Sequence, residues 1–182
     1  MRKIISLFSA CLLMFSLSLA ITDTDAGNTL VKMGLMSGYP DGSLGLEKDI
    51  TRAEFCTLVA KMLKINNEMS FKVDNFSDLK DSHWAYKSVM ALADRGVING
   101  YADSTFRPSK TLTYAECSAI LIGVLGYKEE MVGVWPNNVM DLAENLGLHK
   151  DLKFEKHSDN MTRGNVSIML MNAMNVVVKN NF

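Results

Sequence analysis

Arg52 is the residue whose type and position in this sequence point most directly to binding chemistry. It lies between Thr51 and Glu54, which form a T-x-x-E capping box and so predict the first turn of a helix. Arg52 then takes the first helical position, where the helix dipole slightly disfavours a cation and no cap requires a guanidinium. Two interpretations stay open: a side chain that contacts a ligand, or a solvated surface arginine. In either case its removal is expected to leave folding almost untouched.

The same motif occurs three times along the chain. Its second copy begins 62 residues after the first and carries Tyr114 where the first has an arginine. The third copy begins 111 residues after the first and again carries an arginine, Arg163. For the other residues of the motif we expect helix capping to be the whole role; these are Thr51, Glu54, Thr113, Glu116 and Thr162.

An apolar stripe follows each copy of the motif, with residues spaced i, i+3, i+4, i+7 and i+8. This is the spacing of one face of an amphipathic helix. The three stripes predict three helices packed on one shared core, with Leu58, Leu121 and Leu170 among the buried residues. The full stripes are Phe55, Leu58, Val59, Met62, Leu63; Cys117, Ile120, Leu121, Val124, Leu125; and Val166, Met169, Leu170, Ala173, Met174.

Longer segments around the motif repeat as well. Nine residues between Leu30 and Glu54 reappear 62 positions later with a single offset, which makes chance a poor explanation. Trp84 and Trp135 each stand 12 residues before a glycine that ends a predicted short helix. We therefore divide the chain into helix–loop–helix repeats at about 23–65, 76–127 and 134–178, of which the third is the weakest.

Residues 1–20 have the features of a secretory signal peptide. Arg2 and Lys3 precede an apolar run, and small residues lead up to a cleavage point after Ala20. A retained membrane anchor is the rival interpretation, and a lipid-modified Cys11 is another. The apolar run is shorter than the ~20 residues that a membrane span usually needs, so we expect secretion and no retained membrane span.

Charge and reactive side chains narrow the class of function for residues 21–182. Loss of Arg2 and Lys3 changes the formal net charge from −1 to −3 and leaves no basic block, so nucleic acid is not an expected partner. The three histidines do not fall at metal-ligand spacing, so we expect no metal, no cofactor and no catalysis. Cys56 and Cys117 are either two buried thiols or one bridge between helices, and both interpretations stay open.

Taken together, these motifs resemble the S-layer homology (SLH) domain family. The resemblance rests on Gly-Leu-Met-Ser-Gly-Tyr-Pro-Asp-Gly (34–42) with Ile-Thr-Arg-Ala-Glu-Phe (50–55), and on Gly-Val-Ile-Asn-Gly-Tyr (96–101) with Thr-Phe-Arg-Pro (105–108). It covers essentially the whole chain after residue 20. It implies an all-α fold in which three helix–loop–helix repeats stand in a pseudo-threefold arrangement around a central three-helix bundle, with grooves between neighbouring repeats.

The resemblance also implies a function, which is non-covalent attachment to the bacterial cell wall. The partner would be an acidic, pyruvylated secondary cell-wall polysaccharide, and other cell-surface proteins are a second class of partner. We expect the protein to be secreted and to reside at the cell wall. The alternative is a scaffold or interaction protein that keeps the fold but no longer binds polysaccharide, which the degenerate second and third repeats favour somewhat.

The same resemblance supplies the candidate site. Arginine would bind carboxylates of the polymer bidentately, and tryptophan and tyrosine would offer flat apolar faces to sugar rings. Core packing is the alternative for the two tryptophans, and loop packing for the two tyrosines. The candidate polysaccharide-binding residues are Arg52, Trp84, Asp78, Tyr39, Tyr101, Arg163 and Trp135.

The pairing of these residues depends on which repeats meet. If the arginine of one repeat works with the tryptophan of the next, only Arg52 with Trp84 forms an intact pair. Trp135 would then face Tyr114, which is no cation, and Arg163 would face Thr22, which is no ring. We therefore expect Arg52 to dominate binding and Arg163 to matter less.

Overall fold

The computed structural model describes residues 20–65, 71–73 and 76–179, and this part of the chain is all-α with no strand. The predicted signal peptide, apart from Ala20, lies outside the described residues. A short 3₁₀ helix, η1 (Lys128–Glu130), follows the fourth helix. The α-helices are α1 (Asp23–Lys32), α2 (Arg52–Met62), α3 (Tyr86–Asp94), α4 (Tyr114–Val124), α5 (Asn137–Asn145) and α6 (Arg163–Ala173).

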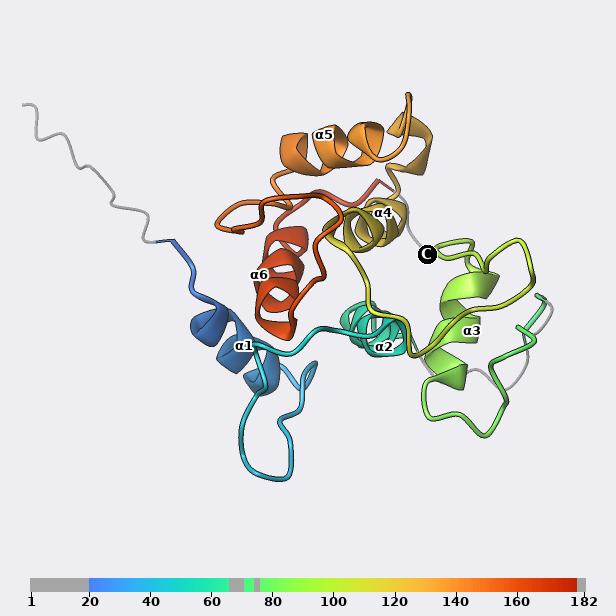
Figure 1. The fold of residues 1–182 in the computed structure, drawn as a ribbon, viewed down its shortest axis with the longest axis horizontal. Coiled ribbons are helices and arrows are strands. Elements are labelled where there is room, and N and C mark those ends of the chain that lie inside the picture. The colour runs from blue at the N-terminus through green and yellow to red at the C-terminus, as the bar shows by residue number, and fades with distance from the viewer. Residues whose placement is uncertain (1–19, 66–70, 74–75, 180–182) are drawn as a thin grey trace, which may run out of the picture.

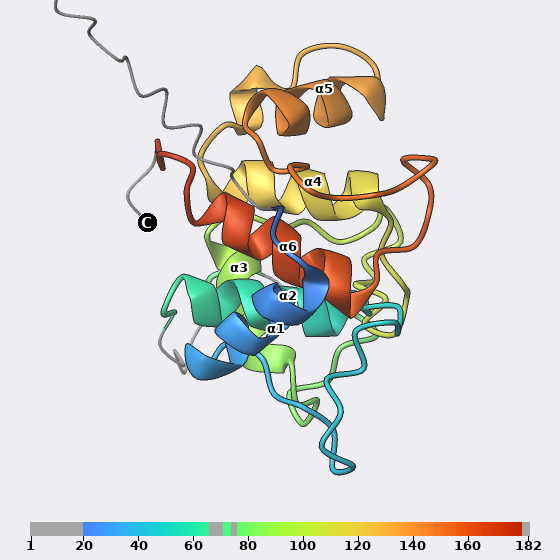
Figure 2. The same cartoon turned by 90° about the vertical axis from the view of Figure 1, so that its left-hand side faces the viewer.

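Three of these helices form the centre and three lie outside them. Figure 1 shows α2, α4 and α6 together in the middle, with α1, α3 and α5 around them. Helix α3 packs on α2 and α5 packs on α4, so an outer helix lies on the central helix that precedes it in the chain. Helix α1 packs on α6, as Figure 2 also shows, and this contact closes the circle between the two ends of the described chain.

The core lies between the central helices and beneath the outer ones. Leu121 and Leu170 are fully buried and Leu58 is 6% exposed, in agreement with the predicted shared core. The central helices are nevertheless buried around more of their circumference than one stripe predicts; in α4, for instance, Ala115, Ser118 and Ile122 are buried too. The reason is that an outer helix covers the side of each central helix that a surface helix would turn to solvent.

Backbone hydrogen bonds join the segments that lead into the central helices. The Ile50 N–H donates to the Met161 carbonyl at 2.8 Å, the Met161 N–H to the Leu112 carbonyl at 2.8 Å, and the Leu112 N–H to the Ile50 carbonyl at 3.2 Å. All three residues are fully buried. The three segments therefore form a closed ring of hydrogen bonds that fixes where each central helix begins.

The N-termini of the central helices are already satisfied within the protein. The Arg52 and Ala53 N–H groups donate to carbonyls of Lys110 and Pro108, in the loop of the following repeat. The equivalent N–H groups at the start of α4 donate to the loop 157–159, and those at the start of α6 donate to the loop 46–48. Because these groups have partners, the helix ends themselves are not vacant anion sites.

Side-chain caps complete these helix starts. Thr51 accepts from the Glu54 N–H at 3.3 Å while Glu54 accepts from the Thr51 N–H at 2.8 Å, which is a reciprocal capping box. Thr113 and Glu116 form the same box at the start of α4. At the start of α6, Thr162 accepts from the Asn165 N–H at 3.2 Å, and the Asn165 side chain turns elsewhere.

Candidate functional site

Two grooves lie beside the central helices, each with a cavity volume of about 260 Å³. We call the first the Arg52 groove. It runs beside α4, and the residues that line it include Arg52, Asn99, Glu116, Lys128 and Trp135. We call the second the Arg163 groove. It runs beside α2, and the residues that line it include Ser37, Glu54, Lys61, Trp84 and Arg163.

Both grooves are assembled in the same way from three repeats. One repeat supplies the central helix and the loop that precedes it, the next supplies the tryptophan, and the third supplies the arginine. The Arg52 groove thus joins α4 with Trp135 from the start of repeat three and Arg52 from repeat one. The Arg163 groove joins α2 with Trp84 from the start of repeat two and Arg163 from repeat three.

The pairing predicted from the sequence is therefore wrong. Trp84 shares a groove with Arg163, and Trp135 shares one with Arg52. The cause is the direction of packing: α3 folds back onto α2 and α5 onto α4, so the tryptophan before each of these outer helices lies beside the preceding central helix. Two arginine–tryptophan pairs are intact, and Arg163 is not the partnerless residue that the sequence indicated.

Both tryptophans are on the surface and neither serves as a core residue. Trp84 is 63% exposed and Trp135 is 53% exposed, although each lines its groove. An exposed indole at the mouth of a groove offers an apolar face and an N–H donor to a ligand. The core-packing alternative for these two residues does not hold.

Arg52 is buried, which rules out the solvated surface arginine. It is 8% exposed, and its Nη2 donates to the Asn99 carbonyl at 2.8 Å. Its guanidinium lies 4.9 Å from the ring centre of Phe106 and 5.4 Å from that of Tyr101. Its buried Nε has no hydrogen-bond partner among the described residues. Arg52 thus ties repeat one to the loop of repeat two, so its loss would disturb that junction, and it keeps an unused donor.

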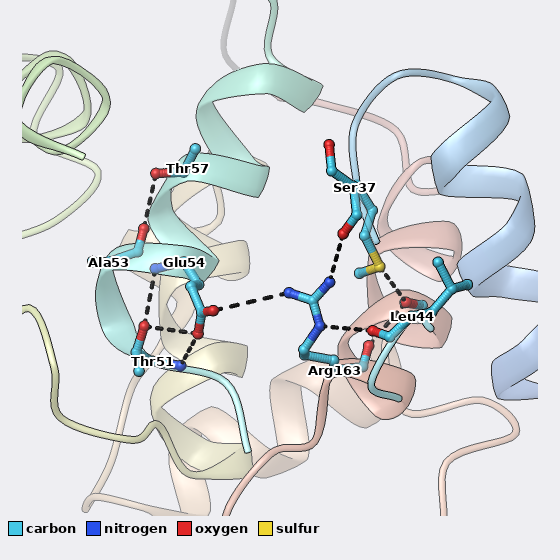
Figure 3. A network of polar contacts seen from close by, with 9 residues as sticks. Ser37, Leu44, Thr51, Ala53, Glu54, Thr57 and Arg163 are labelled. Atoms are coloured by element: carbon cyan, nitrogen blue, oxygen red, sulfur yellow. Dashed lines mark hydrogen bonds and ion pairs between the residues drawn. The ribbon is translucent and has the colours of Figure 1, made fainter. Parts of the chain in front are cut away.

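Arg163 is equally buried and has more partners (Figure 3). It is 7% exposed. Its Nε donates to the Leu44 carbonyl and its Nη2 to the Ser37 carbonyl, both at 3.0 Å. Its Nη1 lies 4.0 Å from Glu54 Oε1, on α2. Arg163 therefore holds the loop of repeat one against two central helices.

The third junction, between repeats two and three, is built differently. Tyr114, in the arginine position, is 2% exposed and donates its hydroxyl to the Lys153 carbonyl at 3.2 Å. It also accepts from the Asn165 amide and stacks on Phe154 with ring centres 4.3 Å apart. Thr22, in the tryptophan position, is the N-cap of α1. This junction has neither the cation nor the indole of the two grooves.

The same junction contains a buried polar pair that the sequence did not reveal. Ser118 Oγ and His149 Nε2 are 2.8 Å apart, and His149 Nδ1 lies 3.5 Å from Glu144 Oε2. Burial lowers the pKa of His149 below its usual value of 6.5, and Glu144 only partly offsets this shift. Ser118 is fully buried, so this arrangement is closed to a substrate. The sequence did contain a signal: Ser118 and His149 are polar, whereas the equivalent positions of the preceding repeats hold Cys56 and Ile98.

The remaining candidates differ in their relation to the grooves. Tyr39 lines the Arg163 groove, with Lys48 Nζ 3.8 Å from its ring centre. Asp78 accepts hydrogen bonds from the N–H groups of Phe106 and Arg107 and so braces the loop of repeat two. Neither Asp78 nor Tyr101 is among the described residues that line the two grooves.

The described residues offer no metal centre and no transmembrane helix. Within them, no group of three or more His, Cys, Asp or Glu side chains is placed to hold an ion, and no helix is sufficiently long and apolar to cross a bilayer. Cys56 and Cys117 are both free and buried, which answers the question of a bridge between them. Burial raises the pKa of the Cys56 thiol to about 12, so it is not a nucleophile at neutral pH.

The fold and the two grooves define a class of protein: an all-α repeat module with grooves that combine a buried guanidinium with an exposed indole. The S-layer homology domain matches residues 28–56 and 75–116. The chain belongs to the S-layer homology domain family, as the sequence motifs indicated.

Similar proteins come from bacterial cell surfaces. The chain is 32% identical to the Middle cell wall protein of Brevibacillus brevis over 159 residues and 31% identical to a Surface layer protein of Brevibacillus choshinensis over 151. It is 34% identical to the Cellulosome-anchoring protein of Acetivibrio thermocellus over 132 residues. These alignments cover 85%, 81% and 66% of this chain, but only 15%, 13% and 29% of the three relatives.

Proposed function

We propose that this chain is a cell-wall anchoring module that binds an acidic, pyruvylated secondary cell-wall polysaccharide in the Arg52 and Arg163 grooves. The observation that carries the proposal is that each groove brings together a buried guanidinium and an exposed tryptophan from different repeats. The repeats 23–65, 76–127 and 134–178 would form one pseudo-threefold unit around α2, α4 and α6.

The chemistry of the grooves suits such a polymer. A sugar ring has an apolar face that packs on an indole, and its hydroxyl groups bond to backbone carbonyls and amides at the groove wall. A pyruvyl carboxylate is best matched by a cation that presents two parallel N–H donors in a planar fork, which arginine provides and lysine does not. Arg52 lines its groove, its side chain donates to the Asn99 carbonyl, and its buried Nε has no partner among the described residues.

The location follows from the relatives and the N-terminal sequence. The similar proteins are named as cell wall, surface layer and anchoring proteins, and residues 1–20 have the features of a signal peptide. We propose secretion to the bacterial cell wall, with no catalysis and no cofactor in this module. A scaffold that no longer binds polysaccharide is the second candidate, because the third junction holds neither arginine nor tryptophan.

The test removes the exposed rings, since their loss should not disturb folding. We would measure co-sedimentation of the protein with purified wall sacculi for Trp84→Ala, Trp135→Ala and the double variant. An aromatic contact contributes about 0.5–1.5 kcal/mol beyond its burial, so each single change should weaken binding by roughly two- to tenfold. The double variant should lose much more, because the two grooves act on one polymer.

Two controls separate the candidates. Val177→Ala changes a side chain that is 77% exposed and lies in neither groove lining, and it should bind like the wild type. Sacculi stripped of their polysaccharide should bind none of the variants. Absence of binding by the wild-type protein would favour the scaffold, and full binding by the folded double variant would remove the grooves as the site.

A further inference from the structure

The two grooves treat an equivalent carboxylate in different ways. Glu54 and Glu116 are 62 positions apart, each lines its groove, and each uses Oε2 to close its capping box. The other oxygen, Oε1, differs in its partner. Glu54 Oε1 lies 4.0 Å from Arg163 Nη1, whereas Glu116 Oε1 is bonded to Lys110 Nζ.

The difference comes from two lysines at matching positions. Lys110 reaches the carboxylate of its own capping box and forms a partly buried ion pair. Both lysines lie over a tyrosine ring: Lys110 Nζ is 5.7 Å from the ring centre of Tyr101, and Nζ of Lys48, its counterpart 62 residues earlier, is 3.8 Å from that of Tyr39, without an ion pair to Glu54 among the described residues. Glu54 therefore remains beside Arg163, while Glu116 is held by a cation that is not part of the groove lining.

The two arginines are left with different capacities. The charge of Arg163 faces a carboxylate, and two of its nitrogens already donate to backbone carbonyls. The Arg52 side chain donates one hydrogen bond, to Asn99, and its buried Nε has no partner among the described residues. Each groove lining also contains one exposed lysine, Lys128 in the Arg52 groove and Lys61 in the Arg163 groove, so these lysines do not distinguish the two grooves.

We propose that the two grooves take different parts of the polymer and that Lys110 sets this difference. The Arg52 groove binds the carboxylate, and the Arg163 groove binds an uncharged sugar ring. Lys110 acts as a positioning residue: it holds Glu116 away from Arg52 and so leaves the guanidinium for an external anion. This inference rests on the proposed function and adds to it a division of labour between the grooves.

Salt dependence tests the division. Trp84→Ala leaves the Arg52 groove complete, and Trp135→Ala leaves the Arg163 groove complete. Binding of each variant to wall sacculi would be measured between about 0.05 M and about 0.5 M NaCl. Over this range the Debye length falls markedly, so interactions between charges weaken. We expect binding through the Arg52 groove to fall about tenfold or more, and binding through the Arg163 groove to change less than about twofold. Equal salt dependence of the two variants would overturn the division while leaving wall binding itself intact.

The role of Lys110 is tested in the Trp84→Ala background. Lys110→Gln frees Glu116 to approach Arg52, so binding should weaken several-fold and lose most of its salt dependence. Adding Glu116→Gln should restore binding, because glutamine still closes a capping box but brings no negative charge. A purely structural role for Lys110 would not give this restoration. Lys110→Arg should bind like its parent.

Lys48→Gln provides the matched control, since Lys48 occupies the equivalent place in repeat one and bonds to no groove carboxylate among the described residues. It should leave the salt dependence of the Arg52 groove unchanged. An equal effect of Lys48→Gln and Lys110→Gln, or an unchanged Lys110→Gln, would contradict the proposal. If the Trp84→Ala and wild-type proteins both fail to bind sacculi, the proposed function itself fails.

Discussion

The second position of the repeated motif has one role that is the same in all three repeats and another that differs between them. Arg52, Tyr114 and Arg163 each send a polar hydrogen to a backbone carbonyl in the loop of another repeat. This inter-repeat bond is what the position always supplies. Under the proposed function, ligand binding is added where a cation at this position stands beside a tryptophan, as Arg52 and Arg163 do.

The buried Ser118–His149 pair predicts how stability depends on pH. Burial lowers the pKa of His149, so the unfolded chain binds a proton more readily than the folded protein. Stability should therefore be complete above the usual histidine pKa of about 6.5 and should decline as the pH falls below it. Glu144, 3.5 Å from the ring, moderates the loss without removing it. Thermal unfolding followed by circular dichroism between about pH 7.5 and about pH 5 measures this decline.

A matched variant isolates the contribution of that histidine. Ser118→Cys with His149→Ile recreates the residues found at the equivalent positions in repeats one and two, Cys56 and Ile98. This double variant should lose the decline around pH 6, whereas His157→Gln, at an exposed position, should keep it. A decline that persists in the double variant would show that other groups cause it.

The three central helices each begin after a threonine N-cap, but their capping is not equally complete. Helices α2 and α4 have complete capping boxes, while α6 has only the threonine half, because Asn165 donates to Tyr114 instead. The backbone N–H groups that follow the cap find carbonyls in a neighbouring loop. Capping is therefore coupled to the contact between repeats.

Thr113→Ala tests whether this threonine is only a cap. It should lower the free energy of unfolding by about 1 kcal/mol, the usual cost of losing an N-cap side chain. Wall binding at low temperature should stay nearly the same, because the hydroxyl points into the helix start and not into a groove. Denaturant unfolding measures the first quantity and co-sedimentation the second, with Thr113→Ser as the conservative control. Loss of binding at unchanged stability would make Thr113 a ligand contact.

At the scale of the whole molecule, the three helix pairs depend on one another. The packing of α1 on α6 and the ring of hydrogen bonds through Ile50, Leu112 and Met161 tie the first repeat to the last. No described pair of helices has a separate core, since the buried apolar residues form one cluster. We therefore expect the described part of the chain to unfold as a unit.

Leu121→Ala tests the shared core. This side chain is fully buried on α4, and such a truncation costs about 2–5 kcal/mol, a large part of the roughly 5–15 kcal/mol that stabilises a typical domain. The melting temperature should fall by many degrees in a single transition. Val132→Ala, at a side chain that is 83% exposed, should change it little. An unchanged melting temperature for Leu121→Ala would contradict the shared core.

The three central helices, their starts and the apolar residues that pack between them could be predicted from the sequence alone. Capping boxes act over three residues and apolar stripes over two turns, so both are local patterns that a linear reading captures. Thr51 with Glu54, Thr113 with Glu116, and the stripes around Leu121 and Leu170 are examples that the structure reproduces.

Which residues share a groove, and what each contributes there, depends on how the helices pack. Trp84 meets Arg163 because an outer helix folds back onto the preceding central helix, and no local pattern carries that direction. Lys110 and Lys48 occupy matching positions and both lie over a tyrosine ring, yet only Lys110 also bonds to the capping-box glutamate. Because a lysine side chain is long and flexible, its partner depends on which side chains the fold brings within its reach. The charge of each groove is therefore a property of the assembled repeats and not of the motif.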